Sequence, residues 1–378
     1  MEESVKIEKL GNIVDVKGGK RLPKGISLIS TPNNHPYIRI RDLGASKILE
    51  LNSAYEYVDD ETQKTIARYI VSSGDILISI VGTIGLVGIV GDSLHGANQT
   101  ENCVKLVNLK GIDRDYLYYF LSSNLGQNEI KRGIVGAVQS KLPIKNIENI
   151  NIPLPSLALQ KSIASILSSL DSKIELNRRI NDNLEQQAQA MFKSWFVENA
   201  SYSGVSISEY FLPNRGKNLL VSDAKGGITP VVAGGLTPSA FHNVANTKAP
   251  VITISASGAN AGFVNLWGIP VWAADSSYID STIVSNIYFW YNLLKYNQKN
   301  IYESQTGSAQ PHIYPKHIGN LLIPDLDMRK VECYESIVTS MYLQINEIQQ
   351  ETKFLSDLRD TLLPKLMSGE LKINDLNC

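Results

Sequence analysis

The sequence has few cysteines and no excess of charge of either sign. Its 378 residues include only Cys103, Cys333 and Cys378, too few and too scattered for a disulfide framework or a zinc site. This usage is typical of a reducing cytoplasm. The 36 basic residues balance 37 acidic ones. Because phosphate neutralisation supplies most non-specific affinity for nucleic acid, this chain is expected to bind nucleic acid weakly without a partner.

Long hydrophobic runs are also missing. The longest apolar stretch, Ile76 to Val90, is interrupted by glycines and falls short of the roughly 20 residues that span a bilayer. Met1 leads directly into polar residues, so no secretory signal is expected. The five histidines are isolated, and none has metal-ligand spacing with a third ligand in view. The sequence therefore predicts neither a membrane protein nor a metal centre.

Two catalytic motifs are absent as well. The chain has no Asn-Pro-Pro-aromatic tetrapeptide of an adenine methyltransferase. It also has no phosphate-binding loop, because Gly18-Gly19-Lys20 is followed by Arg21 without a second glycine at the required spacing. Methyl transfer and nucleotide hydrolysis are therefore not expected of this chain.

What the chain does have is an internal repeat with an offset of 171 residues. The stretch Gly136-Ala137-Val138-Gln139 reappears as Gly307-Ser308-Ala309-Gln310. The same offset relates Lys145, Ile147, Asn149 and Ile152-Pro153 to Lys316, Ile318, Asn320 and Ile323-Pro324. The period is too long for a solenoid, so it indicates two copies of one module.

A long helix is predicted after each copy. Residues 156–198 contain no glycine or proline, and Ser156 can cap the helix start. A seam of period 3.5 runs through Ile163, Leu167, Leu170, Ile174, Asn177, Asn181, Leu184, Ala188, Met191 and Trp195. The offset of 171 predicts a second seam through Tyr334, Val338, Met341, Ile345, Ile348, Thr352, Leu355, Arg359, Leu362 and Leu366. Pro364 is expected to interrupt the end of the second helix.

These patterns predict an α+β chain in four segments. Two globular domains, residues 1–155 and 199–326, alternate with two long helices, residues 156–198 and 327–378. One seam cannot bury itself, so the helices are expected to form an antiparallel coiled coil with approximate two-fold symmetry. In the first domain, residues 37–41 and 75–81 are predicted strands, and residues 86–90 a hairpin partner.

The whole chain resembles the DNA-specificity (S) subunits of type I restriction–modification enzymes. The similarity rests on an ordered set of motifs. The set includes Tyr37-Ile38-Arg39-Ile40-Arg41-Asp42-Leu43, the Gly-Asp-Ile-Leu block from Gly74, the two repeated stretches 136–153 and 307–324, and the terminal residues 362–371. The resemblance implies two target-recognition domains, each reading one half of a bipartite site in double-stranded DNA, on a spacer of two antiparallel helices.

The resemblance also implies the partners. The spacer would dock two methyltransferase subunits that use S-adenosylmethionine to methylate adenine N6, and restriction subunits with ATP- and Mg-dependent translocation would join the complex. The chain itself would hold no cofactor, perform no catalysis and act in the cytoplasm.

In the first domain, cationic and amide side chains are candidate DNA contacts. Arg39 and Arg41, on one face of the expected strand, can read guanine or grip phosphate, or instead lie on a solvated strand edge and pair with Asp42. The remaining candidates are Lys20, Arg21, Thr83, Lys131, Arg132, Gln139 and Lys141. Thr83 lies in the loop 79–85, whose glycines either bring amides close to phosphate or make an ordinary hairpin.

The second domain offers a similar set: Ser257, Asn260, Gln305, Gln310, His312 and Lys316. Gln139 and Gln310 recur at the module offset, which favours base reading, although both could instead cap the following turn. Trp195 and Phe196 could anchor a partner subunit, or pack against the second helix, as the seam position of Trp195 favours. The run Tyr288 to Tyr291 is more typical of a buried helix face than of base stacking.

The sequence therefore predicts a non-enzymatic DNA-recognition subunit. One alternative is a stand-alone repeat enzyme acting on a glycan or nucleotide through its glycine loops, although no acid–base pair or nucleophile recurs in the two copies. A second alternative, a purely structural coiled-coil scaffold, leaves two elaborate domains without a use.

Overall fold

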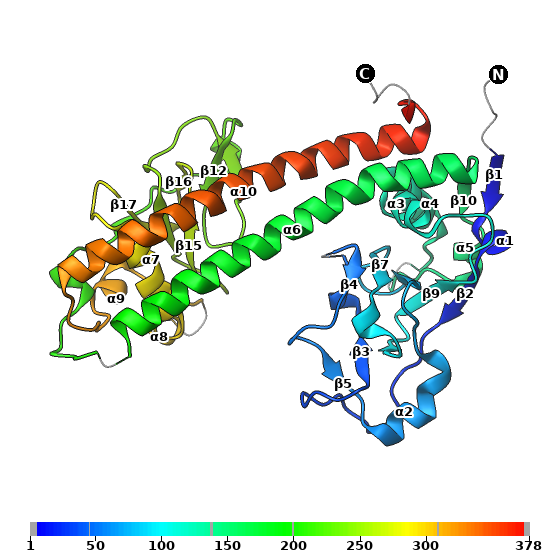
Figure 1. The fold of residues 1–378 in the computed structure, drawn as a ribbon, viewed down its shortest axis with the longest axis horizontal. Helices are drawn as coiled ribbons and strands as arrows, with labels where there is room; N and C mark the ends of the chain where they lie inside the picture. Colours follow the sequence, from blue (N-terminus) through cyan, green and yellow to red (C-terminus); the bar gives the residue numbers. More distant parts are fainter. Residues whose placement is uncertain (1–5, 45, 137–138, 199, 308–309, 374–378) are drawn as a thin grey trace. The chain divides into compact units, whose positions relative to one another are not determined.

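The computed structural model describes residues 6–44, 46–136, 139–198, 200–307 and 310–373. The chain divides into two compact units, each of which is described by itself (Figure 1). Unit 1 comprises residues 1–174 and 354–378, and unit 2 comprises residues 175–353. No helix within the described residues is both long and apolar enough to cross a membrane.

Unit 1 is built around a five-stranded sheet of order β2-β9-β6-β7-β4 and a three-stranded sheet of order β5-β3-β8. The strands are β1 (Lys6–Lys9), β2 (Asp15–Gly18), β3 (Pro36–Ile38), β4 (Ile48–Leu49), β5 (Glu56–Tyr57), β6 (Ile76–Ser79), β7 (Val87–Val90), β8 (Asn98–Gln99), β9 (Cys103–Val107) and β10 (Asn151–Leu154). The helices are α1 (Leu10–Ile13), α2 (Asp60–Ile66), α3 (Arg114–Ser122), α4 (Asn124–Gly133) and α5 (Ile144–Glu148), and 3-10 turns occupy Ile40–Asp42, Ala67–Tyr69 and Asp92–Leu94.

Unit 2 is built in the same way, from a sheet of order β11-β17-β14-β15 and a sheet of order β13-β12-β16. The strands are β11 (Asn214–Arg215), β12 (Thr229–Val232), β13 (Ala240–His242), β14 (Val251–Ser255), β15 (Val264–Trp267), β16 (Trp272–Ala273) and β17 (Ser276–Asp280). The helices are α7 (Ile287–Tyr296), α8 (Gln298–Glu303) and α9 (Pro315–Gly319), with 3-10 turns at Ile207–Glu209 and Val221–Asp223.

The internal repeat extends to the pairing of the strands. In unit 1 the central strand β6 pairs antiparallel with β7 and β9, and β3 pairs antiparallel with β5 and parallel with β8. In unit 2 the central strand β14 pairs antiparallel with β15 and β17, and β12 pairs antiparallel with β13 and parallel with β16. The counterpart of β3, which has no recognisable sequence match, is therefore β12.

The two long helices are α6 (Leu157–Phe196) and α10 (Met328–Ser368). In unit 1, residues 157–174 pack with residues 354–368, and Arg359 of α10 donates to Asp171 of α6 at 2.9 Å. In unit 2, Lys330 donates to the Trp195 carbonyl at 2.6 Å and Asn177 donates to Thr352 at 3.2 Å. The helices run antiparallel in each unit, and all 20 predicted seam residues are buried or half-buried (Figure 1).

The two asparagines predicted in the seam lie in unit 2. Asn177 is fully buried, and its amide donates to Glu351 at 2.8 Å as well as to Thr352. Its carbonyl oxygen and that of Asn181 are buried without a hydrogen-bond partner. A polar pair at this position fixes the register of two helices at some cost in stability.

Two predictions about local structure are wrong. The strand expected over residues 37–41 ends at Ile38, because the Asp42 carboxylate accepts the backbone N–H of Arg39 at 2.7 Å and turns the chain into a 3-10 helix. Pro364 does not end the second helix, which continues to Ser368. Leu366 and Met367 beyond it are buried in the core of unit 1, and their burial offsets the cost of about 3 kcal/mol of an interior proline.

The core of unit 2 is aromatic. Helix α7 buries every residue from Ile287 to Leu294, so the run Tyr288 to Tyr291 is a core face as predicted. Phe192 of α6 is 1% exposed, and its ring centroid lies within about 6 Å of those of Phe196, Phe289, Tyr296 and Tyr334. Aromatic pairs of this kind tie the helix pair of unit 2 to its α7.

A half-buried carboxylate makes a second link between α10 and α7. Glu335 accepts the backbone N–H groups of Phe289 at 2.7 Å and Tyr288 at 3.2 Å, at the start of α7. Burial raises the pKa of Glu335, although the two N–H donors act in the opposite direction. A raised pKa in the folded state means that folding takes up a proton, so this group stabilises unit 2 most at low pH.

We expect Glu335→Gln to remove this pH dependence. In the wild type, the contribution of Glu335 is full below the unfolded pKa of about 4.5 and is lost as pH rises through the raised folded pKa. The free energy of unfolding, measured in urea at pH 5 and pH 7, should therefore differ less in the variant than in the wild type. Glu332→Gln, at an exposed position of α10, is the control. An equal pH difference in Glu335→Gln and the wild type would contradict the assignment.

Candidate nucleic-acid interface

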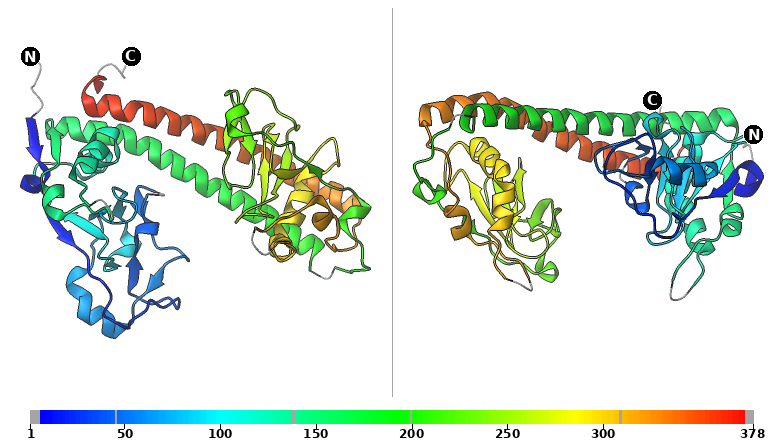
Figure 2. Two further views of the ribbon diagram at one scale, coloured as in Figure 1. Left: turned by 180° about the vertical axis from the view of Figure 1, so that it is seen from behind. Right: turned by 90° about the horizontal axis from the view of Figure 1, so that it is seen from below.

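Each unit carries a short hairpin that extends from the end of its central sheet. Val135 and Lys141 exchange two backbone hydrogen bonds of 2.9 Å in unit 1, and Thr306 and His312 exchange bonds of 3.0 and 2.8 Å in unit 2. In Figure 2 (right) the connection between α4 and α5 extends away from the helix pair of unit 1. Residues 137–138 and 308–309 of the two motifs lie outside the described residues. The described residues of the motif, Gly136 and Gln139 in unit 1 and Gly307 and Gln310 in unit 2, therefore lie between the two paired residues of each hairpin.

The two hairpin turns require glycine at the same point. Gly136 and Gly307 adopt φ values of 97° and 98°. A Cβ atom added to them would lie 2.4 Å from the Gln139 carbonyl oxygen and 2.5 Å from the Gln310 carbonyl oxygen. The turns thus hold Gln139 and Gln310 in equivalent places, and both side chains are exposed. Neither glutamine side chain makes a hydrogen bond among those the structure records for the described residues. The alternative that the two glutamines cap the following turn therefore gains no support.

The glycine loop after the central strand lies beside each hairpin. Val81 pairs with Lys141 in unit 1, and Ser257 pairs with His312 in unit 2. The loops are held by equivalent glutamine amides, since Gln127 donates to the Gly85 carbonyl at 2.9 Å and Gln298 to the Gly262 carbonyl at 2.7 Å. A glycine loop and a polar hairpin thus form one surface in each unit, and we call this surface the hairpin face.

In unit 1 the hairpin face gathers some of the predicted residues. Thr83, Lys131, Gln139 and Lys141 are exposed there, and Arg132 is exposed but paired with Glu129. The other arginines are held elsewhere. Both Arg39 and Arg41 pair with Glu56 of β5, in the case of Arg41 at 3.2 Å, and do not share a strand face. Arg41 also forms an ion pair of 3.6 Å with Asp42, the pairing expected in the second reading. The shared contact with Glu56 was not expected, because it depends on the 3-10 turn after β3.

Lys20 and Arg21 follow β2 and are both exposed. Arg21 forms an ion pair of 2.7 Å with Glu101. Burial alone would raise the pKa of Glu101, but hydrogen bonds from Arg21, from its own backbone and from Thr100 lower it overall. Glu101 is therefore ionised at neutral pH, and it neutralises Arg21.

In unit 2 the predicted residues fall into two groups. Gln310 and Lys316 are exposed, and His312 and Asn260 are half-exposed. By contrast, Gln305 donates to the Ala261 carbonyl at 2.6 Å, which holds the glycine loop. Ser257 donates to the Asp275 carboxylate. Gln305 thus has a structural role that the sequence did not suggest.

Sequence reasoning missed three residues of unit 2 beside this face. Arg215 forms an ion pair of 2.6 Å with Asp275, the acceptor of the Ser257 hydroxyl. Lys217 is exposed one residue after Gly216. The dipeptide Gly216-Lys217 does match Gly19-Lys20, but the match is too short to find without the strand order.

The predicted partner anchors are both part of unit 2. Phe196 is 5% exposed and packs against Phe289 at 5.0 Å and Tyr334 at 5.5 Å. The expectation that Phe196 is an exposed partner anchor is wrong, because this ring at the end of α6 is buried in the core of unit 2. Trp195 is half-buried against Tyr334 at 6.1 Å, which is the predicted packing on the second helix. Contact of Trp195 with a partner stays a prediction.

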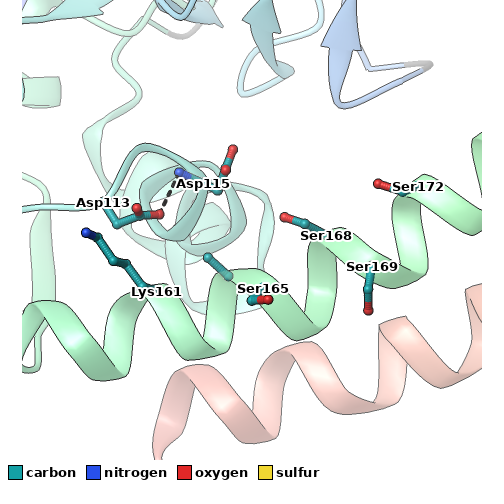
Figure 3. Close-up of a pocket in the computed structure, with 8 residues that line it drawn as sticks. Asp113, Asp115, Lys161, Ser165, Ser168, Ser169 and Ser172 are labelled. Atoms are coloured by element: carbon teal, nitrogen blue, oxygen red, sulfur yellow. Dashed lines mark hydrogen bonds between the residues drawn. The ribbon is translucent and has the colours of Figure 1, made fainter.

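A shallow groove of about 400 Å³ lies in unit 1 between the start of α3 and α6 (Figure 3). Asp113 accepts the N–H of Asp115 at 3.0 Å on one side of it. The other side is formed by small residues of α6 and by Lys161. The groove is separate from the hairpin face, and in the described residues no group of three or more histidine, cysteine or acidic side chains could hold a metal ion.

Comparison with known proteins finds the same family resemblance. Residues 2–186 match the type I restriction modification DNA specificity domain. The chain is a specificity-subunit relative. The resemblance predicted from the sequence is confirmed, and so is the prediction that this chain is not an enzyme.

One relative of this chain extends over nearly its full length, and another over about half of it. The MjaIX type I restriction enzyme specificity subunit of Methanocaldococcus jannaschii is 23% identical, covering 98% of this chain and 94% of its own length. The MjaVIII specificity subunit of the same organism is 25% identical over 49% of this chain and 43% of its own length. The solved S subunit of a type I restriction–modification system from M. genitalium has a TM-score of 0.61 at 21% identity, covering 97% of this chain and 96% of that one. The α+β fold is therefore confirmed.

Proposed function

We propose that this chain is the DNA-reading subunit of a type I restriction–modification complex, and that each unit reads one half of a bipartite site. The observation that carries the proposal is the duplicated hairpin face. The same backbone hydrogen bonds present Gln139 in unit 1 and Gln310 in unit 2. Two units with the same backbone arrangement but different side chains suit a DNA site whose two halves differ in sequence.

The exposed side chains of the two hairpin faces suit the major groove. Glutamine can bind the N6 and N7 atoms of adenine bidentately, and lysine can grip phosphate or guanine. Lys141 lies two residues after Gln139, and His312 two residues after Gln310. A backbone frame that is held by glycine and by glutamine amides leaves such side chains in fixed places, which favours specificity.

The proposal includes the partners that the family resemblance implies. Two methyltransferase subunits would dock on the helix pairs and methylate adenine with S-adenosylmethionine, and restriction subunits would cleave with ATP and Mg²⁺. The chain would act in the cytoplasm, where host DNA lies. The stand-alone enzyme is set aside, because the relatives of the chain are specificity subunits.

Sequencing of modified adenines in host DNA would identify the DNA site that this chain reads. A strain that lacks this gene should lose one split methylation motif that the parent strain has, and complementation should restore the motif. Co-expression with the neighbouring methyltransferase gene should yield a stable complex. An unchanged set of modified motifs in the deletion strain would overturn the proposal.

We expect single glutamine changes to affect one half-site each. A bidentate pair with adenine contributes about 1–3 kcal/mol, so Gln139→Ala should lower methylation roughly fivefold to 150-fold at one base of one half, and relax the preference there. Gln310→Ala should do the same in the other half. Gln344→Ala, at an exposed position of α10, is the control. If both hairpin variants affected the same half-site, the one-unit-one-half assignment would fail.

A further inference from the structure

A second repeated element lies where the two sheets of each unit meet. In unit 1 the N–H of Gly19 donates to the carbonyl of Cys103, the first residue of β9, at 3.1 Å, and the N–H of Lys20 donates to that of Gln99, the last residue of β8, at 3.4 Å. In unit 2 the N–H of Gly216 donates to Ser276, the first residue of β17, at 2.8 Å, and that of Lys217 to Ala273, the last residue of β16, at 2.9 Å. We call this element the Gly–Lys crossing.

The crossing requires glycine in both units. A Cβ atom on Gly19 would lie 2.1 Å from the Thr100 carbonyl oxygen, and one on Gly216 would lie 2.4 Å from the Ala274 carbonyl oxygen. These are backbone atoms that cannot move aside without breaking the sheet connection. The lysine that follows is exposed in each case. Neither Lys20 nor Lys217 has an ion pair among those the structure records for the described part of the chain.

Each crossing also has an arginine beside it that is neutralised by one carboxylate. Glu101 stands in the link between β8 and β9, and its two oxygens accept from Arg21 at 2.7 Å and from the Thr100 hydroxyl at 3.1 Å. Asp275 stands in the link between β16 and β17, where its two oxygens accept from Arg215 at 2.6 Å and from the Ser257 hydroxyl. The same chemistry thus recurs although the arginine follows the Gly–Lys pair in unit 1 and precedes it in unit 2.

The ion pairs are open to water. The side chain of Arg21 is 82% exposed and that of Arg215 is 42% exposed. Exposed pairs contribute only about 0–1 kcal/mol, so an incoming phosphate can take the guanidinium at little cost and bind it through two parallel hydrogen bonds. In unit 2 the Asp275 carboxylate contacts the hairpin face. It accepts the hydroxyl of Ser257, and the backbone of Ser257 pairs with that of His312 in the hairpin.

We propose that the Gly–Lys crossings are phosphate-binding elements for the DNA backbone, and that Glu101 and Asp275 act as latches that mask Arg21 and Arg215 until phosphate displaces them. The proposal rests on the DNA-reading function proposed above. A masked arginine adds little to the long-range field that attracts any DNA, yet it still grips phosphate when base contacts place the duplex close. The latches therefore suppress binding to the wrong sequence, in keeping with the balanced charge of the chain.

Removing the latches should weaken discrimination. The full chain with Glu101→Gln and Asp275→Asn should bind a scrambled duplex roughly threefold to tenfold more tightly than the wild type, measured by fluorescence anisotropy across a KCl series. The control is Glu175→Gln with Glu303→Gln, which changes the net charge equally at exposed i,i+4 pairs with Arg179 and Lys299. Lys20→Gln with Lys217→Gln should reduce the slope of log K against log salt by about 2, since each phosphate contact contributes about 0.9.

The outcomes separate the two proposals. If the latch variant binds scrambled DNA no more tightly than the control, or if the lysine variant keeps the wild-type slope, the latch proposal is wrong, while a wild type that prefers a duplex with the mapped methylation motif still supports DNA reading. If the wild type shows no preference for that duplex and the deletion strain keeps the motif, both proposals fail. Equal thermal midpoints of the variants exclude misfolding as the cause.

Discussion

Duplicating one heptad in each long helix should lengthen the unread gap of the methylated site by about three base pairs. The duplicated blocks are residues 174–180 of α6 and 349–355 of α10, in which Asn177 faces Thr352 and the seam period is kept. Seven residues add about 10 Å of helix, and the duplex rises about 3.4 Å per base pair. Sequencing of modified adenines in a strain that carries the variant measures the gap directly.

The same change should lower total methylation, because three base pairs also turn the second half-site by about three tenths of a helical turn. Duplicating the heptad in α6 alone is the matched control. It removes the partner of the added seam, so we expect a less stable chain and no new motif. A variant that folds, keeps its partners and methylates the original gap would show that the helices do not measure distance.

Phe192→Ala should cause the largest loss of stability among single substitutions in unit 2. Truncation of a buried phenylalanine costs about 3–5 kcal/mol, and the Phe192 ring contacts aromatic residues of α6, α7 and α10. For a unit of this size each kcal/mol lowers the melting temperature by about 2–4 °C, so calorimetry should show one transition lower by roughly 6–20 °C. Methylation should fall with it, since one half of the site loses its reader.

The control for this prediction is Tyr202→Ala, which removes an aromatic ring of unit 2 that is 58% exposed. Its melting temperature should stay within about 2 °C of the wild type. If Phe192→Ala shifted every transition equally, or none, the aromatic cluster would not be the core that holds the helix pair of unit 2 to α7.

The large features of the fold follow from the sequence, and the reason is periodicity. A heptad seam survives substitution because any apolar side chain can fill it, so the 20 seam positions could be predicted one by one and are all buried or half-buried. The repeated motif could be found because Gly136 and Gly307 stand at the same offset, and both adopt a positive φ that suits glycine. Both signals are local, and both recur at the same offset.

The details of the interface could not be predicted in the same way, because they depend on contacts between residues far apart in the chain. Arg39 and Arg41 alternate like strand residues, but one hydrogen bond from the Arg39 backbone to Asp42 ends the strand before them. Gln305 and Gln310 have the same side chain. Gln305 holds the glycine loop only because the Ala261 carbonyl lies within reach of its amide, whereas Gln310 is exposed. Asp275 and Arg215 stand 60 residues apart, with no pattern to join them.

Unit 1 is discontinuous, since residues 354–378 return to it after the whole of unit 2. Its core includes Leu366 and Met367, which a ribosome adds only after the whole of unit 2. During synthesis, therefore, unit 2 can fold first, while the interior of unit 1 stays incomplete until α10 has been made. A nonsense codon in the part of the gene that encodes residues 354–368 would accordingly damage unit 1 as well as α10.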